Sequence, residues 1–220
     1  MISAALFDYD GTLVNTDSVH LDAWNWALHR FGVTLDALSY AANCSGVETP
    51  RAAEKILREH PGVDLSAEAL AVAKDSLYED WVADSILPAM PGVREMLAYL
   101  SEQEIPVGLV TGSPLSGIAK TLEDNKIGQY FQTTVTRGDV ERGKPAPDGY
   151  LIGLQRLGVG PRYSVSFEDT QSGIAAAKAA GMISIAIPST FTKTHDFSRA
   201  DYLCSDMFEA LDVLKELQAS

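Results

Sequence analysis

Short apolar runs alternate with longer helical patterns along most of the chain. The runs end at Gly, Pro or polar residues, which is typical of strands in a buried sheet. They cover residues 2–7, 106–110, 133–135, 164–167 and 183–187. Because helical patterns separate most of these runs, we predict an α/β fold with a three-layer, Rossmann-like core, in which helices cover a parallel sheet.

The helices predicted for this core cover residues 92–101, 115–124, 148–157, 172–180 and 207–217. Gly181 directly follows Ala179 and Ala180, and glycine commonly ends a helix because it adopts a left-handed conformation without steric cost. The next apolar run begins shortly afterwards, so this glycine marks the turn from a helix into a strand.

Residues 15–87 interrupt the alternation. Helical segments follow one another here without a convincing strand, and typical helix-start residues precede them, namely Ser18, Thr49 with Pro50, and Ser66. An all-helical block after the first strand indicates an inserted cap. We predict a core of residues 1–14 and 88–220 and a helical cap of residues 15–87. The alternative is that these helices simply pack on the sheet.

The charge balance limits the class of partner. The 220 residues carry a formal net charge of −13 at pH 7, and Lys and Arg form no cluster. This argues against nucleic acid, whose phosphates are bound through such clusters. An acidic protein can still bind a small phosphate, provided that a cation and a few basic groups make the pocket locally positive, so the charge excludes a polymer more firmly than a metabolite.

No apolar stretch approaches the roughly 20 residues that a membrane-spanning helix needs, and the first residues lack the features of a signal peptide. The two cysteines, Cys44 and Cys204, lie far apart without metal-type spacing. We therefore expect a cytoplasmic protein with buried thiols and no disulfide, and a monomer, because no large apolar stripe is left exposed by the pattern.

The first strand ends in two carboxylates. Asp8 and Asp10 share a direction in an extended backbone, and Gly11 allows a sharp turn beside them. Like charges at this distance repel, and neither loses water readily. Mg²⁺ compensates this cost, since it is usually held by one or two carboxylates and by phosphate oxygens. The alternative is an ordinary turn at a strand end.

Thr111, Gly112 and Ser113 follow the second predicted strand, just before a helix. A hydroxyl, free backbone N–H groups and a helix N-terminus converge there, which suits the oxygens of a phosphate. Ser113 fits a simple helix N-cap equally well. Thr111, at the strand end itself, is harder to explain by capping and is the stronger candidate for an anion contact.

Lys144 and an acidic pair complete the candidate groups. Lys144 stands in a loop stiffened by Pro145 and Pro147, which limits the entropy lost when its ammonium group meets a carboxylate or a phosphate. Glu168 and Asp169 follow the strand 164–167. A helix N-terminus accounts for one of these acids, but two acids here and two at the first strand favour a bound cation.

Together these motifs resemble those of the haloacid dehalogenase-like superfamily of phosphotransferases. In chain order they are Asp8-Tyr9-Asp10-Gly11-Thr12, Thr111, Lys144 and Glu168-Asp169. Residues 16–24 and 167–177 are similar to the beta-phosphoglucomutase-like and sugar-phosphatase branch, which has a small helical cap. Four motifs in order are more specific than any one of them.

The resemblance implies a role for each matching residue. Asp8 is the nucleophile that forms a transient aspartyl phosphate, and Asp10 is the general acid and base. Asp8, the backbone carbonyl of Asp10 and Asp169 hold Mg²⁺, with Glu168 as a further ligand or a neighbour of one. Thr111 and Lys144 bind the phosphoryl oxygens. Gly112 and Ser113 are expected to contact the substrate beside them.

In the predicted cap, His20 and Trp24 lie one helical turn apart and are candidates to face the substrate. His20 is suited to steady Asp10, whereas Trp24 serves equally well as a core residue. Gly46 and Arg51 are further candidate substrate contacts.

The mutases of this branch differ from this chain near Arg51. In them an arginine closely follows the Gly-Val pair and grips a distal phosphate, whereas Glu48-Thr49-Pro50 stands between Val47 and Arg51 here. A phosphatase acting on a monophosphate needs no such grip, so this departure favours hydrolysis over phosphate transfer between two hydroxyls.

The sequence therefore predicts a Mg²⁺-dependent phosphatase for a small phosphorylated metabolite, which the resemblance implies to be a sugar phosphate. A mutase of the beta-phosphoglucomutase type is the alternative, and a non-catalytic binding protein of the same fold is a more remote one. Carbon–halogen hydrolysis in this superfamily needs neither Asp10 nor the second acidic pair. The Schiff-base lysine of a phosphonate-cleaving branch has no persuasive counterpart in Lys55 or Lys74.

Overall fold

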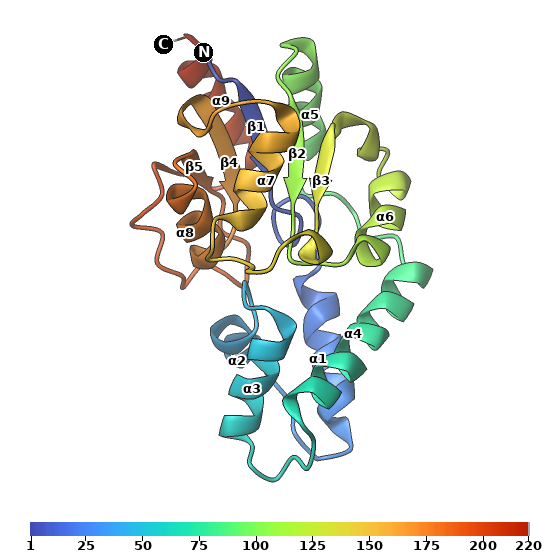
Figure 1. Ribbon diagram of the computed structural model, residues 1–220. Coiled ribbons are helices and arrows are strands. Elements are labelled where there is room, and N and C mark those ends of the chain that lie inside the picture. Colours follow the sequence, from blue (N-terminus) through green and yellow to red (C-terminus); the bar gives the residue numbers. More distant parts are fainter. Residues whose placement is uncertain (220) are drawn as a thin grey trace.

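The computed structural model describes residues 1–219, without the side chains of residues 83, 84 and 117, and is built around a six-stranded sheet (Figure 1). The strands are β1 (Ala4–Phe7), β2 (Val107–Val110), β3 (Thr133–Val135), β4 (Ser164–Glu168), β5 (Ile183–Ala186) and β6 (Tyr202–Leu203). Their order is β3-β2-β1-β4-β5-β6, and all neighbouring pairs are parallel. The predicted fold class is therefore confirmed.

Helices cover both faces of the sheet. They are α5 (Val93–Glu102), α6 (Leu115–Asp124) and α9 (Met207–Ala219) on one face, and α7 (Asp148–Leu157) and α8 (Gln171–Ala179) on the other. The pleat of β1 divides the two cores, because its successive side chains point to opposite faces. Phe7 stacks on Phe167 with ring centroids 4.4 Å apart in the first core, while Leu6 lies in the second.

The last strand was missed by the sequence pattern. β6 has two residues, Tyr202 and Leu203, both exposed, and it pairs only with β5 at the edge of the sheet. A segment this short carries no readable periodicity, and its pairing depends on the path of residues 187–201 that precede it. Short 3-10 helices at Gly128–Tyr130, Arg137–Asp139 and Pro161–Tyr163 complete the elements of the described residues.

Four helices follow β1 directly and lie beyond the carboxyl ends of the strands (Figure 1). They are α1 (Asp17–His29), α2 (Ala37–Asn43), α3 (Thr49–Glu59) and α4 (Ala67–Asp84). Two starts agree with the sequence: Pro50 lies in the first turn of α3, and the Ser66 side chain accepts a hydrogen bond from the Ala69 N–H at the start of α4. The first helix differs, because α1 already begins at Asp17, before the predicted start residue Ser18, and no side chain caps it. Gly181 ends α8 with φ +83°.

These four helices have a hydrophobic cluster of their own. Its largest buried members include Trp24, Leu28, Ile56 and Leu70, separate from the two clusters that flank the sheet. The far end of α4 differs, because Tyr78 packs with the sheet-side cluster. This arrangement supports the proposed division into a cap of residues 15–87 and a core, joined at α4.

Two further predictions concern the whole chain. Cys44 and Cys204 are buried free thiols, as expected. None of the helices within residues 1–219 combines the length and the apolar content that crossing a membrane requires.

Candidate active site

The site forms where β1 ends between its two neighbours in the sheet. Phe7 is in register with Leu109 of β2 and Phe167 of β4, so the residues that follow these three strands meet at one edge. The backbone N–H of Asp8 donates to the Phe167 carbonyl over 3.0 Å, which extends the pairing to the first acidic residue. Parallel strands thus bring together residues that lie more than a hundred positions apart in sequence.

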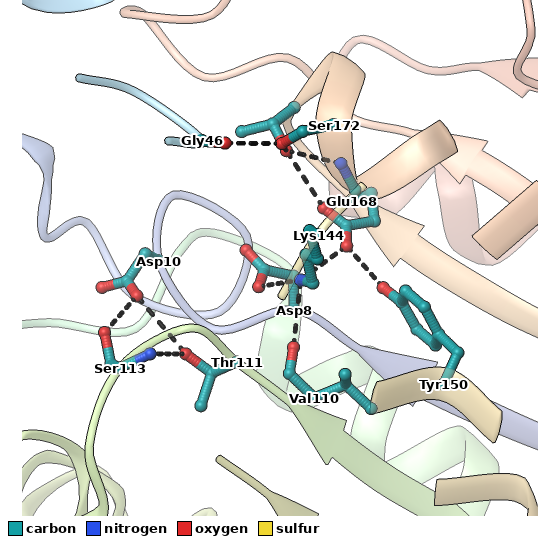
Figure 2. A network of polar contacts seen from close by, with 12 residues as sticks. Asp8, Asp10, Gly46, Val110, Thr111, Ser113, Lys144, Tyr150, Glu168 and Ser172 are labelled. Atoms are coloured by element: carbon teal, nitrogen blue, oxygen red, sulfur yellow. Dashed lines mark hydrogen bonds and ion pairs between the residues drawn. The ribbon is translucent and has the colours of Figure 1, made fainter. Parts of the chain in front are cut away.

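The Lys144 ammonium group lies at the centre of this edge. Its Nζ is 2.5 Å from Oδ1 of Asp8, 2.7 Å from Oε1 of Glu168 and 3.1 Å from the Val110 carbonyl (Figure 2). Burial opposes the charge on Lys144, but the two carboxylates outweigh it and raise the pKa of the ammonium group. Lys144 therefore stays charged, and its position is determined by three oxygen atoms.

Three buried carboxylates gather beside it. Asp8, Glu168 and Asp169 each offer one oxygen, and these oxygens all lie within 4.8 Å of one another. Burial raises the pKa of Asp8 to about 8, with Lys144 opposing the shift and Glu168 adding to it. Burial and then the Asp8 charge raise the pKa of Asp169 well above its ordinary value. The cluster is short of positive charge.

The carboxylate oxygens of this cluster differ in how well hydrogen bonds and positive charge satisfy them. Oδ1 of Asp169 is buried without a hydrogen-bond partner, which is costly for a carboxylate. Glu168 is better satisfied, because the Tyr150 hydroxyl donates to its Oε1 over 2.5 Å and Lys144 lies on the same oxygen. An all-oxygen donor set with an orphaned atom fits a hard divalent cation, to which Asp8, Glu168 and Asp169 could each offer one oxygen.

Asp10 points away from Lys144 into a separate network of hydroxyl donors (Figure 2). The Thr16 and Ser113 hydroxyls donate to its two oxygens over 2.6 and 2.7 Å, and the His20 Nε2 lies 3.3 Å away. Burial works against ionisation here, but His20 and these hydroxyls prevail and lower the pKa of Asp10. Asp8 and Asp10 therefore lie two residues apart, yet their environments shift their pKa values in opposite directions.

Ser113 is not a helix cap. Pro114 occupies the N-cap position of α6 and no side chain caps that helix, whereas the Ser113 hydroxyl is committed to Asp10. Thr111 accepts a hydrogen bond from the Ser113 N–H over 2.9 Å, and its hydroxyl lies 3.5 Å from Asp10. The hypothesis of a simple cap at Ser113 is wrong, because the tight turn directs its side chain back to the first strand.

A cavity of about 140 Å³ opens between this edge and the four helices. Asp8, Asp10, Lys144 and Asp169 line it from the core, together with Gly112 and Ser113. His20, Trp24 and Gly46 line it from the cap side. His20 stacks on Tyr78 with centroids 4.0 Å apart, and Trp24 is buried in the cap cluster while also reaching the cavity.

Gly46 joins the cap to the core. Its carbonyl accepts a hydrogen bond from the Ser172 hydroxyl over 2.6 Å, and its φ is +67° (Figure 2). A Cβ on Gly46 would collide with the Thr170 side chain, so only glycine allows this close approach. Arg51, in contrast, is exposed on α3 and does not line the cavity. At the start of α3 it is Glu48 that lines the cavity, and the substrate contact of Arg51 stays a prediction.

Two residues at or near this cavity were not identified from the sequence, namely Lys74 and Tyr150. Lys74 is 4% exposed and lines the cavity, although its sequence context suggested no role. The sequence does contain a signal for Lys74. It lies four residues from both Leu70 and Tyr78, which places it on the same, buried face of α4. No comparable signal marks Tyr150, whose contact with Glu168 depends on how α7 crosses the sheet.

The packing around Glu168 yields a first testable result. Gly173 lies inside α8, where exchange for alanine normally stabilises a helix by up to about 1 kcal/mol. A Cβ here would instead collide with the carboxylate of Glu168, which is buried completely. We expect Gly173→Ala to lower the melting temperature by several degrees, as measured by circular dichroism.

Gly160→Ala is the matched control for this exchange. Gly160 has an ordinary φ of −88°, and no other group lies within 4 Å of the position that a Cβ would take. Its melting temperature should equal that of the wild type. A Gly173→Ala protein as stable as the control would show that Glu168 moves aside without cost.

The parallel, Rossmann-like sheet has acidic groups and one lysine at the carboxyl ends of its strands and four helices beyond them. This arrangement defines an α/β protein that binds its ligand at the carboxyl edge of the sheet. A family profile narrows this class, since the profile of haloacid dehalogenase-like hydrolases matches residues 5–187. The chain belongs to the haloacid dehalogenase-like hydrolase family, as the motifs predicted.

Individual relatives extend over nearly the whole chain. Validoxylamine A 7'-phosphate phosphatase of Streptomyces hygroscopicus subsp. limoneus is 33% identical over 218 residues, covering 95% of this chain and 96% of the relative. Fructose-1-phosphate phosphatase YqaB of Escherichia coli K12 is 36% identical over 177 residues, covering 80% and 92%. The crystal structure of CbbY from Rhodobacter sphaeroides in complex with phosphate matches with a TM-score of 0.85 and 27% identity, covering 95% and 96%.

Proposed function

We propose that this protein is a Mg²⁺-dependent phosphatase that hydrolyses a small sugar phosphate through an aspartyl phosphate on Asp8. One observation carries the proposal: Asp8 lies against Lys144 and beside the acidic pair, while Asp10, two residues on, faces the same cavity in a different environment. Positive charge beside Asp8, from Lys144 and a bound cation, would favour the ionised form that a nucleophile requires, and Asp10 would then serve as acid and base.

In the first half-reaction, an oxygen of Asp8 attacks phosphorus while the bond to the ester oxygen breaks. Asp10 gives its proton to that leaving oxygen. The phosphate dianion favours the protonated form of Asp10 before reaction, because a nearby negative charge raises the pKa of a carboxyl group. Lys144, Thr111 and the N–H groups around Gly112 would bind the phosphoryl oxygens.

In the second half-reaction, water attacks phosphorus of the aspartyl phosphate and inorganic phosphate leaves. Asp10 now takes the proton from water, and its lowered pKa keeps this carboxyl in the ionised form that accepts a proton. Thr16, Ser113 and His20 keep its oxygens in place for both proton transfers. The same carboxyl thus alternates between its two forms within one turnover.

Asp8, Asp169 and the Asp10 carbonyl would hold Mg²⁺, with Glu168 beside them. When bound, the ion neutralises charge on Asp8 and on the phosphoryl oxygens. The orphaned Oδ1 of Asp169 and the shortage of positive charge in the cluster support this assignment. Lys144 supplies the protein's own positive charge at the same place.

The nature of the substrate is supported by the cavity and by the relatives. Polar groups of the cap, including Ser45, Thr49 and Lys74, line the cavity opposite the reacting carboxylates and suit a hydroxyl-rich molecule. Two relatives carry names that state phosphatase activity on validoxylamine A 7'-phosphate and on fructose 1-phosphate.

A steady-state assay tests the proposal. We expect the purified protein to release inorganic phosphate from a panel of sugar phosphates with Mg²⁺, to lose this activity on addition of EDTA, and to recover it with excess Mg²⁺. Activity that persists in EDTA would contradict the metal assignment. With glucose 1-phosphate and its 1,6-bisphosphate, formation of glucose 6-phosphate faster than phosphate release would establish the mutase alternative.

A further inference from the structure

Glu48 is an acidic side chain of the cap that reaches the proposed phosphate site. It stands at the N-cap position of α3, is half-buried, and lines both the main cavity and the smaller hollow beside Lys144. A Cβ on Gly143 would collide with its carboxylate, so Glu48 lies directly against the backbone of the loop that carries Lys144. The cap thereby places a carboxylate beside the core loop that carries Lys144.

The Glu48 carboxylate has no partner among residues 1–219. No hydrogen bond or ion pair reaches it, and it caps no N–H group of α3. The other cap acid of the cavity, Asp17, is satisfied, since it accepts hydrogen bonds from Tyr40 over 3.0 Å and from Ser189 over 3.2 Å. Glu48 is therefore free to accept hydrogen bonds from a molecule in the cavity.

The cavity lining as a whole carries more carboxylates than lysines. Among the described lining residues, the carboxylates are Asp8, Asp10, Asp17, Glu48 and Asp169, and the lysines are Lys74 and Lys144. Both lysines are already paired, Lys74 with Asp75 over 3.2 Å and Lys144 with Asp8. Neither of these two lysines is therefore free to bind a second phosphate group of the substrate.

We infer that Glu48 is a specificity-determining residue, which selects phosphate monoesters whose alcohol part carries hydrogen-bond donors and excludes esters with a second phosphate. The inference rests on the proposed phosphatase function and deepens it. A carboxylate accepts hydrogen bonds from sugar hydroxyls, and it repels a phosphate that replaces one of them. Discrimination by a missing or mismatched polar contact is strong, because the protein group is then left unsatisfied.

Three substrates and two variants test this inference. The substrates are fructose 1-phosphate, fructose 1,6-bisphosphate and phenyl phosphate, which lacks hydroxyl groups. We expect Glu48→Gln to lower the ratio of kcat/KM for the monophosphate over that for the bisphosphate by about tenfold. Phenyl phosphate is the reference substrate, because it offers residue 48 neither hydroxyl groups nor a second phosphate, and its kcat/KM should change less than this ratio does. Glu48→Lys should lower the same ratio further, because it attracts the second phosphate.

Glu54→Gln is the matched control. It removes the same charge from the same helix, but Glu54 is exposed and does not line the cavity, so the ratio should stay at the wild-type value. A merely structural role of Glu48 between cap and core would change turnover of all three esters together. That result overturns the inference, as does an unchanged ratio in both Glu48 variants.

The wild type separates failure of this inference from failure of the proposed function. Absence of hydrolysis of all three esters with Mg²⁺ rejects the phosphatase function and this inference with it. Hydrolysis of phenyl phosphate without a preference for fructose 1-phosphate over the bisphosphate leaves the phosphatase function intact and rejects the role of Glu48 alone.

Discussion

Asp8→Asn is expected to abolish turnover of phosphate esters, with a fall in kcat on the order of 10⁴-fold or more. The amide does not attack phosphorus, so the covalent route is closed, and binding alone leaves little rate enhancement. The protein should remain folded, because Lys144 keeps its ion pair with Glu168 over 2.7 Å and its bond to the Val110 carbonyl. Phosphate release with phenyl phosphate and Mg²⁺ measures the effect, and the melting temperature checks the fold.

Asp22→Asn is the appropriate control for this variant. Asp22 is exposed on α1 and is not part of the cavity lining, yet its exchange changes the net charge by the same amount. Its kcat should equal that of the wild type. If Asp8→Asn kept the wild-type rate, Asp8 would not be the nucleophile and the proposed mechanism would fall.

Asp10→Asn should separate the two half-reactions. An ester with a good leaving group, such as p-nitrophenyl phosphate, needs little help from an acid, so Asp8 still captures the phosphoryl group. The second half lacks its base, and we expect steady-state turnover to fall by roughly 10²- to 10⁴-fold. The observable is a burst of about one equivalent of nitrophenolate per enzyme, followed by slow release of phosphate.

The interpretation of this burst depends on Asp10 staying in place. Asparagine keeps the size of the side chain and still accepts hydrogen bonds from Thr16 or Ser113 through its amide oxygen, so the loop should be retained. Steady-state rates equal to the wild type would remove Asp10 as acid and base. Slow turnover without a burst would place its action in the first half-reaction.

The sheet could be predicted because buried strands leave a strong local pattern. The apolar runs at residues 2–7 and 183–187 stand out from the polar segments around them, and the structure forms β1 and β5 there. β6 gave no such pattern, because it has two exposed residues and depends on pairing with β5 alone. Local sequence determines a strand only where burial is extensive.

The core half of the site was equally visible in sequence. Asp8, Lys144 and Asp169 follow predicted strands, and the carboxyl ends of parallel strands necessarily meet at one edge. The cap half was visible only in part, since His20, Trp24 and Gly46 were candidates and line the cavity. Arg51 and Glu48 stand near one another in the chain, yet Glu48 lines the cavity and Arg51 is exposed. The rotation of α3 about its axis and its docking on the core decide between them.

The amino-acid sequence by itself determined the α/β class, the inserted helices and the acidic and basic groups at the strand ends. These features are local, since they follow from burial periodicity, helix-start residues and the position of a residue after a strand. Tertiary structure alone decided that Asp8 pairs with Lys144 while Asp10 pairs with hydroxyls, and that Glu48 meets the Gly143 loop. Electrostatic environments and side-chain contacts across the cavity depend on distances between remote segments, which no local pattern contains.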